Sequence, residues 1–153
     1  MKEIQRTSYL EWLSGWKDKG IIKVITGIRR CGKSTLMRQY QQKLLEQGVQ
    51  QEQIISLNFE DMTYSHLLNA QALHEYLVSL LQAERQNYIF LDEVQLVSEF
   101  EKAVNSLYLK PNVDIYLTGS NAHMLSGELA TLLSGRYVKI NMLPLSFKEY
   151  TQD

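Results

Sequence analysis

A strand–loop–helix pattern near the N-terminus limits the folds open to this chain more than any other feature. The loop fits the pattern Gly-x-x-x-x-Gly-Lys-Ser/Thr and reads Gly27-Ile28-Arg29-Arg30-Cys31-Gly32-Lys33-Ser34. A β-branched apolar run at 21–26 precedes it and predicts a buried strand. Apolar residues at helical spacing follow it as far as Gly48, which predicts a helix. We therefore expect the loop to join the carboxyl end of a strand to the start of a helix.

The residue types in this loop suit the binding of phosphate groups. Gly27 and Gly32 let the backbone curl so that successive N–H groups point at an anion. Lys33 would reach the β- and γ-phosphate oxygens of a nucleotide, and the Ser34 hydroxyl would bind Mg²⁺. The helix that opens at Ser34 would direct its positive N-terminus at the same anion. The candidate nucleotide-binding residues are Gly27, Ile28, Arg29, Arg30, Cys31, Gly32, Lys33, Ser34 and Thr35.

Length and composition fit a single domain, which we place at 1–153. The net charge of −1 gives no general basic field for nucleic acid, and no apolar run reaches the about 18 residues of a membrane span. The lone cysteine, Cys31, excludes an internal disulfide and predicts a reducing, cytoplasmic compartment. In the loop, Cys31 would be a small space-filling residue or a redox-sensitive gate on nucleotide binding.

Strand and helix signals alternate along the whole chain. Further apolar runs at 53–59, 87–91, 113–117 and 137–141 predict strands, and helical stripes separate them. This alternation predicts a three-layer αβα sandwich with a five-stranded, mostly parallel sheet. Capping boxes are expected at the first helix, from Ser8 and Glu11, and before the fourth, from Ser98 and Glu101.

An acidic pair, Asp92-Glu93, follows the apolar run at 87–91. A carboxylate at a strand end beside the phosphate loop can hold Mg²⁺, and we assign that role to Asp92. Glu93 would orient and polarise the water that attacks the phosphate. The alternative role for such a pair is to cap the helix that follows.

Two other strand ends carry polar residues. Asn58 would hydrogen-bond Glu93 and hold it away from the water if its strand lies beside the Asp92 strand; otherwise it is a turn residue. The fourth strand ends at Thr118-Gly119-Ser120-Asn121. A side chain from Thr118, Ser120 or Asn121 would contact the γ-phosphate or the water, and the same segment could cap the next helix.

Three arginines have alternative roles. Arg136 lies just before the fifth strand, and its guanidinium would stabilise the transition state in its own subunit or a neighbouring one. The alternative is a surface or salt-bridged arginine. Arg29 and Arg30 lie within the loop. They would either lean over the phosphates or remain solvated.

Several motifs together resemble the AAA superfamily of P-loop ATPases, which has an additional strand and a catalytic glutamate. They are Thr26-Gly27-Ile28-Arg29-Arg30-Cys31-Gly32-Lys33-Ser34-Thr35-Leu36, Phe90-Leu91-Asp92-Glu93-Val94-Gln95, Leu117-Thr118-Gly119-Ser120-Asn121, Ser134-Gly135-Arg136-Tyr137 and the tail Leu143-Pro144-Leu145-Ser146-Phe147-Lys148-Glu149-Tyr150. The closest likeness is to a prokaryotic family that joins such a core to a C-terminal domain of unknown role. Because relatives continue past the tail, we expect this chain to be an N-terminal core without the lid and that domain.

The resemblance implies a strand order of 5-1-4-3-2 and a set of residue roles. Lys33, Ser34 and Asp92 would be the ATP–Mg²⁺ ligands, and Glu93 the catalytic glutamate. Asn58 would be the polar residue of a glutamate switch. The segment from Thr118 to Asn121, with Thr118 and Ser120, would be the first sensor, and Arg136 an arginine finger acting in trans.

We therefore expect ATP binding and Mg²⁺-dependent ATP hydrolysis that couples nucleotide state to an attached domain or partner. The alternative is a nucleotide-binding switch with negligible hydrolysis. A small-molecule phosphotransferase would require an acceptor pocket and a lid arginine, for which the sequence offers no segment. The absence of an Asn-Lys-x-Asp segment disfavours GTP. Homo-oligomerisation through Arg136 is implied, no protein partner is identified, nucleic acid rests on analogy alone, and no membrane is expected.

Overall fold

The computed structural model describes residues 7–120 and 131–143. The helices are α1 (Thr7–Gly15), α2 (Lys33–Glu46), α3 (Ala70–Leu80) and α4 (Phe100–Tyr108). The strands are β1 (Ile22–Thr26), β2 (Ile54–Asn58), β3 (Asn87–Asp92), β4 (Val113–Gly119) and β5 (Tyr137–Asn141). Short 3₁₀ helices are η1 (Gln51–Gln53), η2 (Met62–Leu67) and η3 (Val94–Leu96).

The strands form one sheet in the order β2-β3-β4-β1-β5, and every neighbouring pair is parallel. Read from the other edge, this is the predicted order 5-1-4-3-2, which is confirmed. The register pairs Asn58 with Asp92 and Thr26 with Gly119. Because the strands are parallel, the loops after β1, β2, β3 and β4 all leave the same edge of the sheet.

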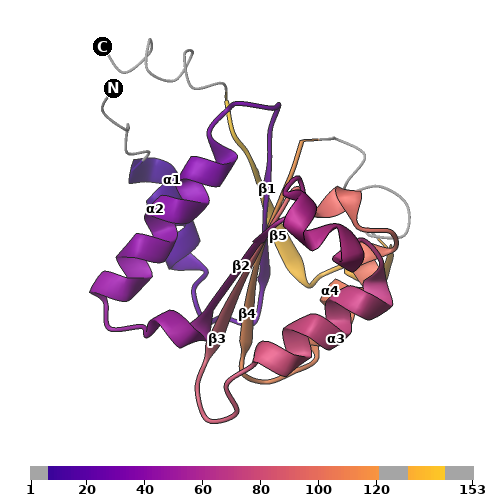
Figure 1. Cartoon of the computed structure of the whole chain (residues 1–153). Helices are drawn as coiled ribbons and strands as arrows, with labels where there is room; N and C mark the ends of the chain where they lie inside the picture. The colour runs from indigo at the N-terminus through magenta and orange to yellow at the C-terminus, as the bar shows by residue number, and fades with distance from the viewer. Residues whose placement is uncertain (1–6, 121–130, 144–153) are drawn as a thin grey trace.

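Helices cover both faces of the sheet, which confirms the three-layer sandwich (Figure 1). One core lies between the sheet and α1 with α2, and includes Leu13, Leu36, Tyr40, Leu44, Ile25, Phe90 and Tyr116. The other lies between the sheet and α3 with α4, and includes Leu73, Leu77, Val104, Leu107, Val24, Ile89 and Leu117. Both faces of β3 are therefore buried, which explains its continuous apolar run.

Both predicted capping boxes are wrong. Ser8 lies inside α1, because Thr7 is already helical. α4 begins at Phe100, and its N-cap is Glu99 in the left-handed conformation without a side-chain cap. The Ser98 N–H instead donates to the Leu68 carbonyl at 2.9 Å, which ties this loop to the start of α3.

Helix α2 begins and ends close to the predicted positions. It starts at Lys33, one residue before the predicted Ser34. At its C-terminus, Gly48 has φ +102°, and the Val49 N–H donates to the Leu44 carbonyl at 3.0 Å. This left-handed glycine ends the helix as the sequence predicts. The predicted helix around Leu125 lies mostly outside the described residues.

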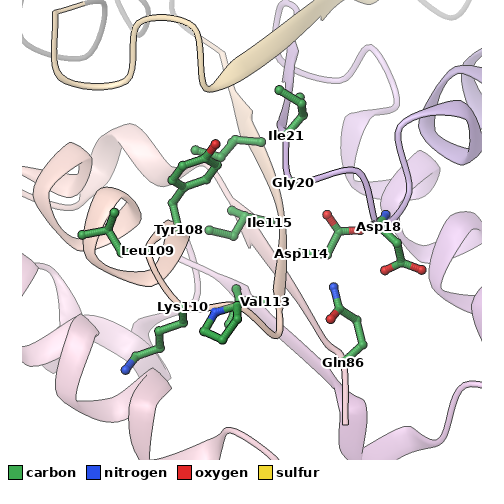
Figure 2. A pocket seen from close by; sticks show the side chains of 12 residues that line it. Asp18, Gly20, Ile21, Gln86, Tyr108, Leu109, Lys110, Val113, Asp114 and Ile115 are labelled. Atoms are coloured by element: carbon green, nitrogen blue, oxygen red, sulfur yellow. Dashed lines mark hydrogen bonds between the residues drawn. The ribbon is translucent and has the colours of Figure 1, made fainter.

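A buried ion pair joins β1 and β4 near the amino edge of the sheet. The Lys23 ammonium donates to the Asp114 carboxylate, and both side chains are almost fully buried. Beside it lies a cavity of about 630 Å³ (Figure 2). Asp18, Gln86 and Asp114 line one side of it, and Tyr108 lines the other. This cavity is at the edge opposite the phosphate loop, since its residues lie before the strands or within the first three residues of them.

Candidate functional site

The predicted phosphate loop spans the turn from β1 to α2 at the carboxyl edge of the sheet. Its curvature comes from two residues in the left-handed region, Arg30 with φ +65° and Gly32 with φ +98°. The first backbone hydrogen bond of α2 runs from the Leu36 N–H to the Gly32 carbonyl at 2.9 Å. The N–H groups before Leu36 therefore have no acceptor within the helix, and an anion could accept from them.

Gly27 is required by close packing beneath the loop. A Cβ atom at this position would lie 2.6 Å from the Cys31 Sγ atom and 3.1 Å from the Met142 carbonyl oxygen. Cys31 is buried, with 1% of its surface exposed. This geometry agrees with the space-filling role for Cys31, because the sulfur atom occupies the volume that a larger residue 27 would need.

Lys33 is buried and folds back over the loop. Its ammonium donates to the carbonyls of Gly27 at 2.8 Å and Ile28 at 3.1 Å, and to Ser120 Oγ at 3.2 Å. The Lys33 Nζ atom also lies 3.6 Å from a Glu93 carboxylate oxygen. The cation therefore stands between the loop backbone and the ends of β3 and β4.

The Asp92 carboxylate lies directly against the start of α2. It accepts hydrogen bonds from the hydroxyls of Ser34 and Thr118, one on each oxygen. Asp92 is buried, with 7% of its surface exposed. A serine hydroxyl and a carboxylate in contact supply the oxygen donors that Mg²⁺ takes from a protein, with water and substrate completing its shell. The donor set thus fits the metal that the sequence predicts.

Glu93 occupies a constrained position next to Asp92. Its φ of +57° is unusual for a residue with a side chain, and its N–H donates to Thr118 Oγ1 at 2.9 Å. Its carboxylate accepts from Gln95 Nε2 at 2.7 Å and from Ser120 Oγ at 2.7 and 2.8 Å. Burial raises the pKa of Glu93, but these hydrogen bonds and the charges of Lys33 and Arg29 outweigh it, so the pKa is lowered.

Ser120 connects the two sides of the site, since its hydroxyl contacts both Lys33 and Glu93. Thr118 contacts Asp92 and the Glu93 backbone instead. The structure thus separates two members of the predicted sensor segment. The third, Asn121, lies outside the described residues.

The structure does not join Asn58 to Glu93, although their strands are neighbours as predicted. The Asn58 Oδ1 atom accepts from the Glu60 N–H at 3.0 Å, which forms a local turn after β2. That turn presents Glu60 to Arg29, and their charged groups form an ion pair. Arg29 is therefore engaged with Glu60 in a largely exposed pair.

Arg136 lies at the opposite edge of the sheet from the loop. Its carbonyl accepts from the N–H of Ile22, the first residue of β1. Its guanidinium donates to Asn105 Oδ1 and stands 5.4 Å from the centre of the Tyr108 ring. Since a five-residue strand spans about 16 Å, Arg136 and the loop of the same chain are separated by the length of the sheet.

A cleft of about 390 Å³ lies over the loop and is lined by Arg29, Arg30, Gly32, Lys33, Ser34, Thr35, Glu60 and Glu93. Ile28, in the same loop, is 60% exposed. The sequence prediction missed Glu60 and Gln95 as neighbours of the site. Gln95 lies two residues after Glu93, within the motif at 90–95 that carries the resemblance, but no role was assigned to it from the sequence. Glu60 lies two residues after the end of β2.

Comparison with known proteins agrees with this geometry. A family model described as an AAA domain matches residues 19–151. An uncharacterized protein of Haemophilus influenzae is 47% identical over 148 residues, which are 96% of this chain and 37% of that protein. Uncharacterized protein MJ1544 of Methanocaldococcus jannaschii is 37% identical over 131 residues, 84% of this chain and 28% of its own length. The chain thus spans well under half of either relative.

Solved structures share the fold at low sequence identity. A DNA polymerase III gamma subunit-related protein of Thermotoga maritima has a TM-score of 0.64 at 11% identity, over 94% of this chain and 49% of its own. PCH-2 of C. elegans has a TM-score of 0.62 at 17% identity, over 94% and 44%. A chain of the Drosophila ORC bound to AT-rich DNA and Cdc6 has a TM-score of 0.61 at 10% identity, over 91% and 54%. None of the helices in the described part of this chain is long and apolar enough to cross a membrane.

Proposed function

Because the chain belongs to the AAA-domain family within the AAA superfamily of P-loop ATPases, we propose that it binds ATP with Mg²⁺ and hydrolyses it. The observation that carries this proposal is the contact between the Ser34 hydroxyl and the Asp92 carboxylate. It brings the two predicted metal ligands together from α2 and β3, beside the Lys33 ammonium. The two residues are 58 positions apart in the chain, and the parallel sheet brings their segments to the same edge.

The binding residues act on the phosphate groups. The N–H groups of the loop and the Lys33 ammonium would donate to the β- and γ-phosphate oxygens. Lys33 would exchange its present carbonyl acceptors for these charged oxygens, which are stronger acceptors. Ser34 and Asp92 would hold Mg²⁺, which supplies Lewis-acid stabilisation of the phosphate oxygens when bound.

Glu93 would serve as the general base. Its carboxylate would accept a proton from a water as that water attacks the γ-phosphorus and the bond to the β–γ bridging oxygen breaks. Thr118 supports this role indirectly, because it orients both Asp92 and the Glu93 backbone. Ser120 would report the γ-phosphate, because its hydroxyl lies between Lys33 and Glu93.

We assign Arg136 to a neighbouring subunit's site, not its own. It lies at the far edge of its own sheet, so a contribution to catalysis requires assembly. The two relatives are much longer than this chain. The nucleotide state would therefore be relayed to a domain or partner beyond the ATPase core.

One observation favours the alternative function, a nucleotide-binding switch with negligible hydrolysis. The Glu93 carboxylate accepts hydrogen bonds from the protein's own Gln95 and Ser120 and lies close to Lys33. A carboxylate engaged in this way has little capacity left to accept a proton from a water in the cleft. Such a chain would bind ATP and change state without turning it over.

Phosphate release and ATP binding separate these functions. Glu93→Gln should retain ATP binding and reduce turnover by about a hundredfold or more, since it removes the general base. Glu75→Gln on α3 is the matched control and should change neither quantity. If the protein binds ATP without measurable turnover, the switch is the correct function. If it does not bind ATP, both assignments fail.

A further inference from the structure

We propose that Gln95 restrains the Glu93 carboxylate, and that turnover requires the Gln95 amide to let go of it. The inference rests on the proposed ATPase function and adds a positioning residue that regulates it. The sequence prediction gave this task to Asn58, whose side chain instead holds the turn at Glu60. Gln95 makes the contact that Asn58 does not make.

The contacts around Glu93 come from three separate elements. Gln95 Nε2, from η3, donates to Oε1 at 2.7 Å. Ser120 Oγ, after β4, lies within 2.8 Å of both carboxylate oxygens, and Lys33 Nζ, from α2, lies 3.6 Å from Oε2. Donors thus surround the carboxylate of Glu93, whose side chain is 8% exposed. A general base in this state has little capacity to accept a proton from water.

These donors differ in what ATP would do to them. Lys33 and Ser120 lie against the phosphate loop and would turn toward phosphate oxygens. Gln95 donates to the Oε1 atom of Glu93, whereas Lys33 lies near Oε2, and the contact of the Gln95 side chain is with Glu93 and not with Lys33. Gln95 is therefore the donor that nucleotide binding leaves in place.

The Gln95 side chain can rotate away from Glu93 while the backbone of η3 stays in place. Val94 and Val97 are buried with at most 1% exposure, so the backbone of η3 is fixed on both sides of it. The Oε1 atom of Gln95 is buried and has no hydrogen-bond partner among the described residues. An amide with an unmatched buried oxygen is costly to keep, so rotation of the side chain gives up one contact and can gain another.

Replacement of Gln95 by a residue of similar length without a donor tests the restraint. For Gln95→Met we expect kcat for ATP hydrolysis to rise about tenfold, the equivalent of one hydrogen bond to a charged group, with KM for ATP unchanged. The matched control is Gln71→Met, which removes a similar amide–carboxylate contact, from Gln71 to Glu75 at 2.7 Å on α3. The control should change neither constant. Structural damage would lower kcat, so a rise is specific to release of the base.

A second measurement needs no turnover. In amide NMR spectra of the nucleotide-free protein, the Gln95 side-chain signals, identified by their loss in Gln95→Met, should shift on Glu93→Ala and stay unchanged on Glu75→Ala. The Gln71 side-chain signals should shift on Glu75→Ala and stay unchanged on Glu93→Ala. This readout also holds if Gln95→Met folds poorly, because it uses wild-type Gln95.

The outcomes separate the two proposals. If turnover depends on Glu93 but Gln95→Met lowers kcat or leaves it unchanged, the restraint is overturned and the ATPase remains. The restraint is also overturned, and the ATPase remains, if the Gln95 side-chain signals do not shift on Glu93→Ala. If neither the wild-type protein nor Gln95→Met hydrolyses ATP, the ATPase assignment fails, and with it the restraint.

Discussion

At the scale of single residues, the close approach of Gly27 to Cys31 is the most sharply defined contact of the loop. Because a Cβ atom at Gly27 would lie 2.6 Å from the Cys31 sulfur, we expect Gly27→Ala to lower the free energy of unfolding by about 1–3 kcal/mol. Gly15→Ala, at a position with open space around the added carbon, is the control and should cost almost nothing. Urea denaturation measures both.

The double variant Gly27→Ala/Cys31→Ala decides whether the sulfur is the cause. It should recover part of the lost stability, because the Met142 carbonyl would still lie 3.1 Å from the new carbon. A double variant no more stable than Gly27→Ala would contradict the space-filling role of Cys31. The loss of stability in Gly27→Ala would then arise from the backbone of the loop.

Tyr88 gives the protein a predicted sensitivity to alkaline pH. Burial and the hydrogen bond to Asp18, at 3.0 Å, raise the pKa of Tyr88 from 10.0 to about 12. A group with a raised pKa stabilises the fold fully below its unfolded pKa, and this stabilisation is lost between pH 10 and about 12. The difference in unfolding free energy between wild type and Tyr88→Phe should therefore be constant from about pH 7 to 9 and shrink above pH 10. A difference that stays constant to pH 11 would contradict this assignment.

The sequence identified some site residues and missed others for a physical reason. Lys33, Ser34 and Asp92 follow from fixed spacings around strand ends, and the structure brings them together. Gln95 was missed, because its contact with Glu93 depends on the left-handed backbone at Glu93, which no residue type announces. Asn58 lies on the strand beside Asp92, as predicted, but its side chain forms a local turn with Glu60 and not a hydrogen bond to Glu93.

At the scale of elements, the Lys23–Asp114 pair locks the starts of β1 and β4 together. The Asp114 carboxylate also accepts from the Asp18 N–H at 3.1 Å and the Tyr116 hydroxyl at 2.9 Å. Burial lowers the pKa of Lys23 despite this partner. Asp114→Leu should lower the free energy of unfolding by about 3–5 kcal/mol, because it leaves the Lys23 charge buried without its partner carboxylate.

The double variant Lys23→Met/Asp114→Leu should recover most of that loss, because both charges are gone. Lys102→Met is the control for a surface pair, with Glu99 as its partner, and should change stability by less than about 1 kcal/mol. Chemical denaturation of the four proteins measures this. A double variant as unstable as Asp114→Leu would show that the pair is not the source of the loss.

The elements themselves were largely predictable, and their ends were not. Apolar runs predicted all five strands of the described sheet, because a parallel sheet buried on both faces leaves little room for polar residues. A charge inside two of these runs, at Lys23 and Asp114, was the signal of a buried ion pair that the sequence analysis did not use. The capping box at Ser98 failed because the backbone there pairs with the Leu68 loop.

At the scale of the whole molecule, Arg136 distinguishes a monomer from an assembly. Its guanidinium is held by Asn105 at the edge far from the loop, so Arg136→Ala should lower turnover only under conditions in which subunits associate. Turnover measured across protein concentration, with the mass in solution determined in parallel, tests this. Equal loss of turnover in a proven monomer would indicate a structural role.

Strand order and topology came from the resemblance and are confirmed, whereas assembly remains a prediction.

The central claim is that the loop, Lys33, Ser34 and Asp92 form one site for ATP and Mg²⁺. The most direct test is calorimetric titration of the protein with ATP, with and without Mg²⁺, for wild type, Lys33→Ala, Asp92→Asn and the control Lys43→Ala at the other end of α2. We predict that Mg²⁺ strengthens ATP binding by the wild type and Lys43→Ala, that Lys33→Ala weakens binding by about tenfold or more, and that Asp92→Asn removes the effect of Mg²⁺. Unchanged ATP affinity in Lys33→Ala, or an undiminished effect of Mg²⁺ in Asp92→Asn, would contradict the site.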